Sequence, residues 1–193
     1  MPDQPQRLNA FAALCRDGRY GAHPARPGIA LRVLRALTMI DLRGDPRHAA
    51  FLASARAALD MELPLTPNTT AAGPGSTVLW LGPDQWLLVG DRYSESLPVT
   101  GGFLTDVSHG RAGVRISGTH VRDVLAKGCA LDLHPRVFAA GRCAQTAIAR
   151  VSVLLHCTGG GADFDLYCAR SYAGHVWHWL TEASGEFGYE VRT

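Results

Sequence analysis

Residues 113–119, GVRISGT, decide the fold, because they repeat the pattern of residues 37–46, LTMIDLRGDP, earlier in the chain. Each stretch has the composition of a strand that ends at a glycine. A stretch with helical spacing follows each one and ends in an Ala-Leu-Asp sequence that leads to a proline, at residues 58–64 and 130–135. The sequence therefore predicts the same strand-turn-helix unit twice.

The turn residues support this prediction. Gly44 and Gly118 permit a sharp turn from strand to helix. Asp45 is a good helix N-cap and Pro46 suits the first helical position, so we expect a helix to begin there. Thr119 is expected to cap the second helix in the same way.

Two strands joined by a turn are expected after each helix. Residues 78–81 and 86–89 flank a Gly-Pro-Asp-Gln turn, and residues 149–157 and 164–168 alternate on either side of three glycines. Because these glycines, residues 159–161, lie between strands, we expect a hairpin turn and not a nucleotide-binding loop. The pattern predicts an α+β fold of two ferredoxin-like β-α-β-β halves, with antiparallel sheets and helices on one face.

Proline and glycine recur in residues 1–28, which we therefore expect to form an arm or linker. Residues 29–193 are expected to form one domain, with halves at about 29–98 and 99–193. The 193 residues are 47% hydrophobic and 19% charged, which is a globular composition.

The charge and the apolar runs exclude several classes of protein. A formal charge of +2, with Lys127 as the one lysine, argues against nucleic-acid binding. Apolar runs such as residues 151–155 are far shorter than the ~20 residues that span a bilayer, so no membrane segment is expected. We expect a cytoplasmic protein whose five cysteines, which include no Cys-x-x-Cys pair, are free and mostly buried.

Two sets of residues carry a resemblance to known families. Residues 104–111, LTDVSHGR, and the following residues 114–118 resemble the Asp-x-Ser-His region of aminomethyltransferase-type folate proteins, including the glycine-cleavage T-protein. A second resemblance, to the gamma subunit of heterotetrameric sarcosine oxidase, covers roughly residues 29–185. It rests on residues 80–86 (WLGPDQW), 131–138 (LDLHPRVF), 141–146 (GRCAQT) and 170–172 (RSY).

The second resemblance implies a function. In that family the complex oxidatively demethylates sarcosine and can pass the one-carbon unit to tetrahydrofolate. FAD, FMN, NAD and zinc are then expected in the partner subunits alpha, beta and delta, with no cofactor in this chain. The resemblance implies a T-protein-like fold and a non-catalytic, scaffolding role, with tetrahydrofolate as a possible ligand. The alternative is a stand-alone folate-binding or aminomethyltransferase-like protein.

No catalytic residues are expected, and the folate-binding candidates are weak. His109 belongs to the Asp-x-Ser-His stretch, whereas Asp132 and Asp106 are carboxylates at turns, where Asp often bonds its own backbone. Arg170 continues a strand alternation and is expected to face the core, held by an ion pair or, less favourably, by a folate carboxylate. Cys143 beside Arg142 is a weak candidate nucleophile.

The last helix raises two further questions. His175, His178 and Glu182 lie along one side of it, but we expect a solvated polar face and no metal site. Trp177 lies off the apolar stripe of this helix, so we expect Trp177 and Ala173 to contact a partner subunit. The alternative is that the N-terminal arm covers Trp177.

Overall fold

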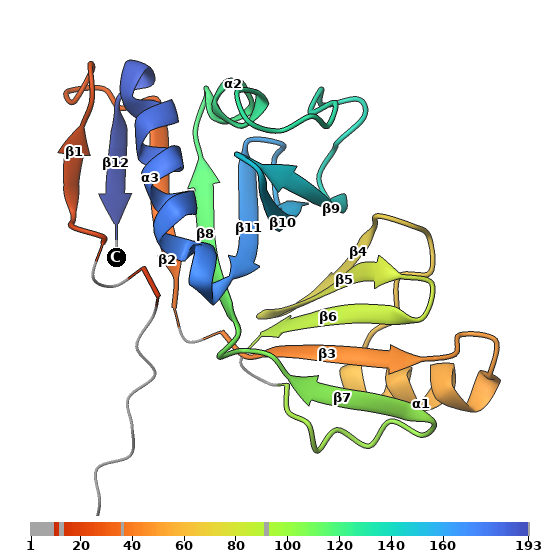
Figure 1. Cartoon of the computed structure of the whole chain (residues 1–193). Helices are drawn as coiled ribbons and strands as arrows, with labels where there is room; N and C mark the ends of the chain where they lie inside the picture. Colours follow the sequence, from red (N-terminus) through yellow and green to blue (C-terminus); the bar gives the residue numbers. More distant parts are fainter. Residues whose placement is uncertain (1–9, 12–13, 36, 91–92, 193) are drawn as a thin grey trace, which may run out of the picture.

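The computed structural model describes residues 10–11, 14–35, 37–90 and 93–192. They form two β-sheets with helices on the outer face of each, so the expected α+β class with antiparallel sheets is confirmed (Figure 1). All neighbouring strands are antiparallel except β12 and β2, which are parallel.

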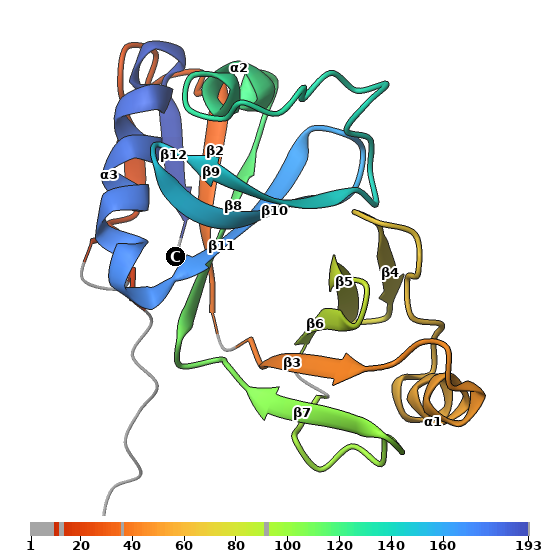
Figure 2. The same ribbon diagram turned by 45° about the vertical axis from the view of Figure 1, so that its right-hand side comes forward.

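The larger sheet has seven strands in the order β1-β12-β2-β8-β11-β10-β9. Its strands are β1 (Gly18–Tyr20), β2 (Ile29–Leu34), β8 (Arg111–Ser117), β9 (Cys143–Ile148), β10 (Val151–Cys157), β11 (Asp163–Ala169) and β12 (Tyr189–Arg192). The helices α2 (Val121–Ala126) and α3 (Ala173–Ser184) cover one of its faces, as Figure 2 shows from the side. Two short 3-10 helices, η1 (Arg170–Tyr172) and η2 (Gly185–Phe187), flank α3.

The smaller sheet has five strands in the order β4-β5-β6-β3-β7. Its strands are β3 (Met39–Gly44), β4 (Thr70–Gly73), β5 (Ser76–Gly82), β6 (Gln85–Gly90) and β7 (Gly102–Asp106). The helix α1 (Ala49–Leu59) packs on its outer face through Phe51, Ala55 and Leu59. A third apolar cluster joins the inner faces of the two sheets and includes Leu79 and Leu87 of the smaller sheet and Leu154 and Tyr167 of the larger.

The two sheets are interleaved along the chain. β2 belongs to the larger sheet, β3 to β7 form the smaller one, and the chain then returns to the larger sheet at β8. The division between the sheets therefore does not coincide with the expected division near residue 98. Residues 1–9 and 12–13 of the expected arm lie outside the described residues, and residues 18–20 form β1.

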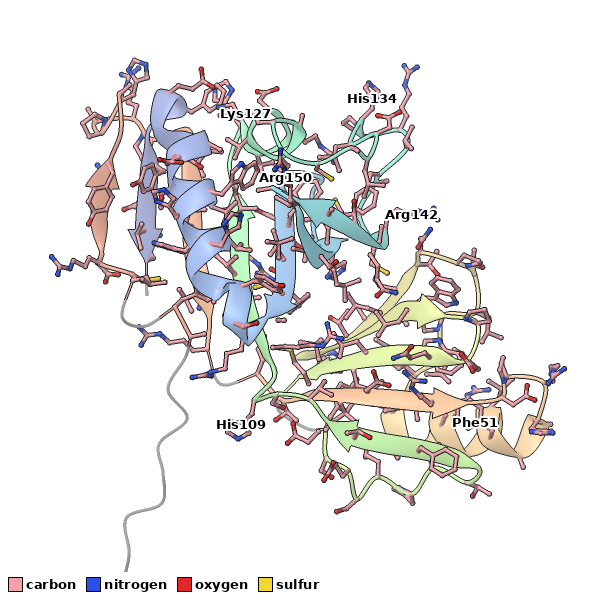
Figure 3. The ribbon with its side chains drawn as sticks, viewed as in Figure 1. Phe51, His109, Lys127, His134, Arg142 and Arg150 are labelled. Atoms are coloured by element: carbon pink, nitrogen blue, oxygen red, sulfur yellow. The ribbon has the colours of Figure 1, made fainter. Side chains whose placement is uncertain are left out.

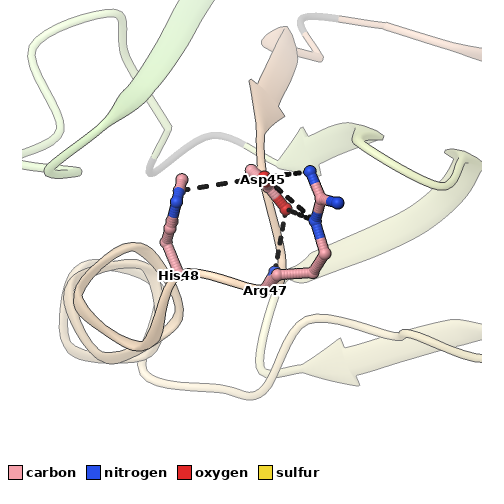
Figure 4. A network of polar contacts seen from close by, with 3 residues as sticks. All are labelled: Asp45, Arg47 and His48. Atoms are coloured by element: carbon pink, nitrogen blue, oxygen red, sulfur yellow. Dashed lines mark hydrogen bonds and ion pairs between the residues drawn. The ribbon is translucent and has the colours of Figure 1, made fainter.

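The first helix begins later than expected. α1 starts at Ala49, with His48 at the N-cap position and no side-chain cap. The Oδ1 atom of Asp45 instead accepts a hydrogen bond from the backbone N–H of Arg47 (2.9 Å), and its carboxylate also binds the Arg47 guanidinium (2.7 Å; Figure 4). Because these local bonds hold Asp45 in a turn, its carboxylate does not cap the helix. The expectation of a helix beginning at Pro46 was wrong.

The second helix also begins later than expected, and one predicted strand is shorter. α2 starts at Val121 with His120 at the N-cap position, two residues after Thr119. β10 begins at Val151, because Ala149 and Arg150 form the turn after β9, with positive φ angles of 49° and 69°. Positive φ angles at both turn residues match the right-handed twist of the two strands in a two-residue hairpin. Glycine or asparagine is the usual residue at such positions.

Candidate functional site

Polar side chains lie on the inner face of the larger sheet, which is the face away from the helices. They alternate along the strands with apolar residues that face the helices. The register of β8, β11 and β10 places Arg115 opposite Asp165 and Asp165 opposite His156. Neighbouring residues Val114, Ile116, Phe164 and Leu166 point the other way, into the core under α2 and α3. The three polar residues therefore lie in one row across the sheet.

Arg115 and Asp165 form a two-pronged ion pair. The Nε atom of Arg115 donates to Oδ1 of Asp165 (2.6 Å) and Nη2 donates to Oδ2 (2.8 Å). The Asp165 side chain is 7% exposed and that of Arg115 38%, so the carboxylate is buried and the cation partly solvated. The hydrogen bonds to Asp165 raise the pKa of Arg115, and burial, followed by the charge of Asp165, raises that of Tyr167.

His156 is the least satisfied member of the row. The residue is 6% exposed, and its Nδ1 atom has no hydrogen-bond partner among the described residues. Burial lowers the pKa of His156, and the charge of Asp165 opposes this effect. The burial of His156 opposite the ion-paired Asp165 fits a structural role in the sheet.

An open groove of about 670 Å³ lies on the same face, nearer the segment that joins β7 to β8. Leu154, Tyr167 and Val107 contribute apolar walls, and Arg111 contributes a cation. Arg111 has neither a hydrogen bond nor an ion pair to any described residue, and burial lowers the pKa of its guanidinium, although the nearby charge of Asp41 opposes this. The groove therefore offers an anion-binding group but no acid–base pair.

The thiols near this face are not activated. Burial raises the pKa of Cys143 to about 11, and the adjacent Arg142 offsets only part of that effect. Burial likewise raises the pKa of Cys168, which lines the groove, to about 11. Both thiols stay protonated near neutral pH, so the weak expectation of a Cys143 nucleophile finds no support.

The Asp-x-Ser-His stretch joins the two sheets through local bonds. Oδ1 of Asp106 accepts a hydrogen bond from the N–H of Ser108 (2.8 Å), as expected for an aspartate at a turn. The Oγ atom of Ser108, which is buried, accepts a bond from the N–H of Met39 at the start of β3 (2.8 Å). These contacts fix the crossing from β7 to β8 and account for two residues of the motif without any ligand.

The three folate candidates do not converge. His109 is exposed beside the start of β8, and the N–H of Arg170 donates to the carbonyl of Gly110 next to it (2.9 Å). Asp132 accepts a bond from the N–H of His134 (2.9 Å), and Figure 3 shows His109 and His134 at opposite ends of the larger sheet. Asp132 therefore lies apart from His109 and Arg170, so the structure does not bring the three candidates together.

Arg170 also differs from its expected position. It is exposed, and the strand alternation ends one residue earlier, because the chain turns into η1 at Arg170. The prediction that Arg170 faces the core was wrong.

The structure places the two residues of the expected partner contact, Trp177 and Ala173, inside the chain. Trp177 is 7% exposed and Ala173 1% exposed, so both are buried within the chain. The ring of Phe11 lies 5.8 Å from that of Trp177, which matches the alternative that the N-terminal segment covers it. A partner would reach Trp177 only after Phe11 moved away.

The polar side of α3 shows no shared ligand. Nε2 of His178 lies 3.3 Å from Oε1 of Glu182, whereas His175 contacts the carbonyl of Ala149 (3.1 Å). Among the described residues, no three His, Cys, Asp or Glu side chains gather in a way that could hold a metal ion. Within the same residues, no helix has the length and apolar character needed to cross a bilayer.

Comparison with known proteins places the chain in a family. Residues 43–186 match the model of the "Sarcosine oxidase, gamma subunit" family. The chain belongs to this family. A gamma subunit from Corynebacterium sp. (strain P-1) is 34% identical over 170 residues, which cover 84% of this chain and 83% of that protein. A gamma subunit from Arthrobacter sp. is 35% identical over 167 residues, covering 82% of this chain and 81% of that protein.

Solved structures support the gamma-subunit fold. A chain of the heterotetrameric sarcosine oxidase from Corynebacterium sp. U-96 matches with a TM-score of 0.81 and 30% identity, over 94% of this chain and 96% of that one. Aminomethyltransferase T of the glycine cleavage system from Bartonella henselae matches with a TM-score of 0.59 and 15% identity, over 86% of this chain and 48% of that one. The second likeness confirms the expected T-protein-like fold and nothing about activity.

Sequence reasoning missed the polar groups on the inner face of this gamma-family chain, namely Arg111, Arg115, His156 and Asp165. A signal was present, because each of these residues alternates with buried apolar neighbours in its strand. Alternation predicts the outward side of a strand, but it does not say that a second sheet lies over part of that side.

Proposed function

We propose that this chain is a non-catalytic, scaffolding subunit of a cytoplasmic heterotetrameric sarcosine oxidase. Its family membership, over most of the chain, is the observation that carries the proposal. In such a complex the chain would bind partner subunits, which we infer to be alpha, beta and delta. The complex would demethylate sarcosine oxidatively and pass the one-carbon unit to tetrahydrofolate.

The chemistry of the described side chains supports a role without catalysis. The buried imidazole of His156 has a lowered pKa, the thiols of Cys143 and Cys168 have raised pKa values, and Asp165 is engaged by Arg115. These groups do not form a nucleophile with a neighbouring base. As the family resemblance implies, we infer that FAD, FMN, NAD and zinc belong to the partner subunits.

The test is to express the full chain alone and together with the other subunits. The isolated chain should contain no flavin by absorbance and should not oxidise sarcosine. The assembled complex should contain flavin and oxidise sarcosine. An affinity tag on this chain should recover flavin-containing partners. Sarcosine turnover by the isolated chain would contradict the scaffolding role.

The second candidate function is folate binding by the chain alone, motivated by the T-protein-like fold and the Asp106-x-Ser108-His109 stretch. Its proposed residues are dispersed, and Ser108 is occupied with the backbone of Met39. Titration of tetrahydrofolate against the isolated chain, followed by calorimetry, distinguishes the two proposals. Tight binding that Arg170→Ala or Asp132→Ala weakens would favour the folate-binding function.

A further inference from the structure

The inner face of the larger sheet is only partly covered. The apolar cluster between the sheets includes Cys143, Leu154 and Tyr167, from β9, β10 and β11. On the other half of the sheet, Arg32 of β2 is exposed, and the side chain of Arg192 of β12 is 70% exposed. On the half formed by β12, β2 and the adjoining part of β8, these arginine side chains are therefore not covered by any residue that the structure describes.

Three arginines form a row on this uncovered half. The register pairs Arg192 with Arg32 across β12 and β2, and Arg32 with Arg115 across β2 and β8. Their neighbours Val191, Leu31 and Val114 point to the opposite face, into the core under the helices. Adjacent strands lie about 4.8 Å apart, so these guanidinium groups share one strip of surface. We call this row the arginine strip.

The two outer members of the arginine strip have anionic partners. Arg115 binds Asp165 through two hydrogen bonds, and Nη2 of Arg192 lies 2.9 Å from Oε2 of Glu190. The guanidinium of Arg32, between them, has neither a hydrogen bond nor an ion pair to any residue that the structure describes. Within the arginine strip, and among the residues that the structure describes, the central cation is therefore the member without a carboxylate partner.

Placing Arg32 between two other arginines is electrostatically unfavourable, even though each outer arginine has a carboxylate partner. Like charges directly opposite each other on neighbouring strands destabilise a sheet. Water and salt relieve the repulsion at an exposed surface, as on many solvated sheet faces. A carboxylate placed against Arg32 would relieve it further, because a guanidinium binds a carboxylate through two parallel hydrogen bonds. Arginine is also enriched in protein interfaces, where its planar group retains hydrogen bonds after losing water.

We propose that the arginine strip docks against an acidic surface of a larger subunit of the oxidase complex, with a carboxylate of that subunit seated on Arg32. The inference rests on the proposed function, because it needs the complex to exist. It goes further by naming the surface and the charge of the partner. The contact forms between an exposed face and a complementary charge, so it raises the rate of association and weakens as salt increases.

The test compares two charge reversals in the full chain, each co-expressed with the other subunits. Arg32→Glu places an anion in the centre of the arginine strip. Arg136→Glu changes the net charge equally at an exposed arginine on the loop between α2 and β9, far from the strip in the fold, and the Arg136 side chain has no hydrogen bond or ion pair to a described residue. Arg32→Gln removes the cation without adding an anion.

We expect Arg32→Glu to weaken assembly at least tenfold, as measured by the subunit concentration needed for half-maximal complex formation. Arg32→Gln should have a smaller effect, and Arg136→Glu should behave like the wild type. The isolated Arg32→Glu chain should unfold at the same temperature as the wild type or higher, because Arg32 makes no bond that the substitution removes. Such a result assigns the loss to docking and not to folding.

Two outcomes overturn the inference while leaving the proposed function intact. In the first, the wild type and Arg32→Glu assemble equally well. In the second, Arg136→Glu weakens assembly as much as Arg32→Glu, which indicates a general effect of charge. Failure of the wild-type chain itself to bind flavin-containing subunits would instead refute the proposed function.

Discussion

Breaking the Arg115–Asp165 pair from either side should have unequal effects on stability. Arg115→Met leaves the Asp165 carboxylate, in a residue 5% exposed, without its two charge-assisted hydrogen bonds. Removing one partner of a buried pair typically costs about 3–5 kcal/mol. Asp165→Asn instead leaves Arg115, whose side chain is 38% exposed and can turn to water, so we expect a loss of about 1–3 kcal/mol.

These energies convert into measurable shifts. A loss of 1 kcal/mol lowers the Tm of a domain of this size by about 2–4 °C. Arg115→Met should therefore lower the Tm by about 12 °C, and Asp165→Asn should lower it by about 6 °C. Urea unfolding of the isolated chain, followed by circular dichroism, gives the free energies directly. Because the two residues interact, the losses in the free energy of unfolding should not add. The loss for the double variant should be smaller than the sum of the two single losses by at least about 1 kcal/mol.

The outcome that refutes this reasoning is equal or reversed sensitivity. If Asp165→Asn destabilised the chain as much as Arg115→Met, the burial of the carboxylate would not decide the energetics of the pair. Additive losses would show that the two side chains do not interact in solution. Arg136→Met serves as the matched control, because that exposed arginine has no ion pair to a described residue and its loss should be nearly neutral.

Three further predictions concern His156, Gly118 and Phe11. Because burial lowers the pKa of His156 below its ordinary value of 6.5, the unfolded chain binds the proton more readily, and stability should fall as pH drops below about 6.5. The slope of the unfolding free energy against pH cannot exceed about 1.4 kcal/mol per pH unit for one proton, and His156→Asn should reduce it. Identical pH profiles for the wild type and the variant would contradict this prediction. Gly118→Ala should lower the free energy of unfolding in urea by more than about 1 kcal/mol, because φ is +123° and the new Cβ meets the carbonyl of Gly28. Gly159→Ala serves as the control and should be nearly neutral, since open space surrounds Gly159. Phe11→Ala should lower the free energy of unfolding by about 3–5 kcal/mol, because Phe11 is fully buried. It should also increase iodide quenching of tryptophan fluorescence, because the Phe11 ring lies 5.8 Å from that of Trp177. Unchanged quenching would show that Phe11 does not shield Trp177.

Several features of the fold could be predicted because they depend on residues close in sequence. The apolar runs on either side of the Gly-Pro-Asp-Gln turn predicted β5 and β6, and alternation predicted β11. The glycines at 159–161 lie between β10 and β11 as expected. The turns at Asp106 and Asp132 were also predictable, since each carboxylate bonds a backbone N–H two residues away. Helix starts were less predictable, because Asp45 bonded Arg47 and did not cap α1.

The candidate site could be predicted only in part. The family resemblance was confirmed, yet the polar row of Arg115, Asp165 and His156 depends on the register of three strands that come together from separate parts of the chain. Trp177 shows the same limit, because helical spacing placed it off the apolar stripe, while Phe11 supplied the cover from a distant segment.

The sequence by itself determined the strands β3, β5, β6, β8, β10 and β11, the approximate helices, the α+β class and the family, because periodicity and motifs are properties of neighbouring residues. The tertiary structure alone decided that β2 leaves the first half to pair with β8 and β12, and that the smaller sheet covers only part of the larger. Strand pairing brings together residues such as Arg32 and Arg192 that the sequence keeps far apart. The charge of a surface is therefore a consequence of register, which no local pattern encodes.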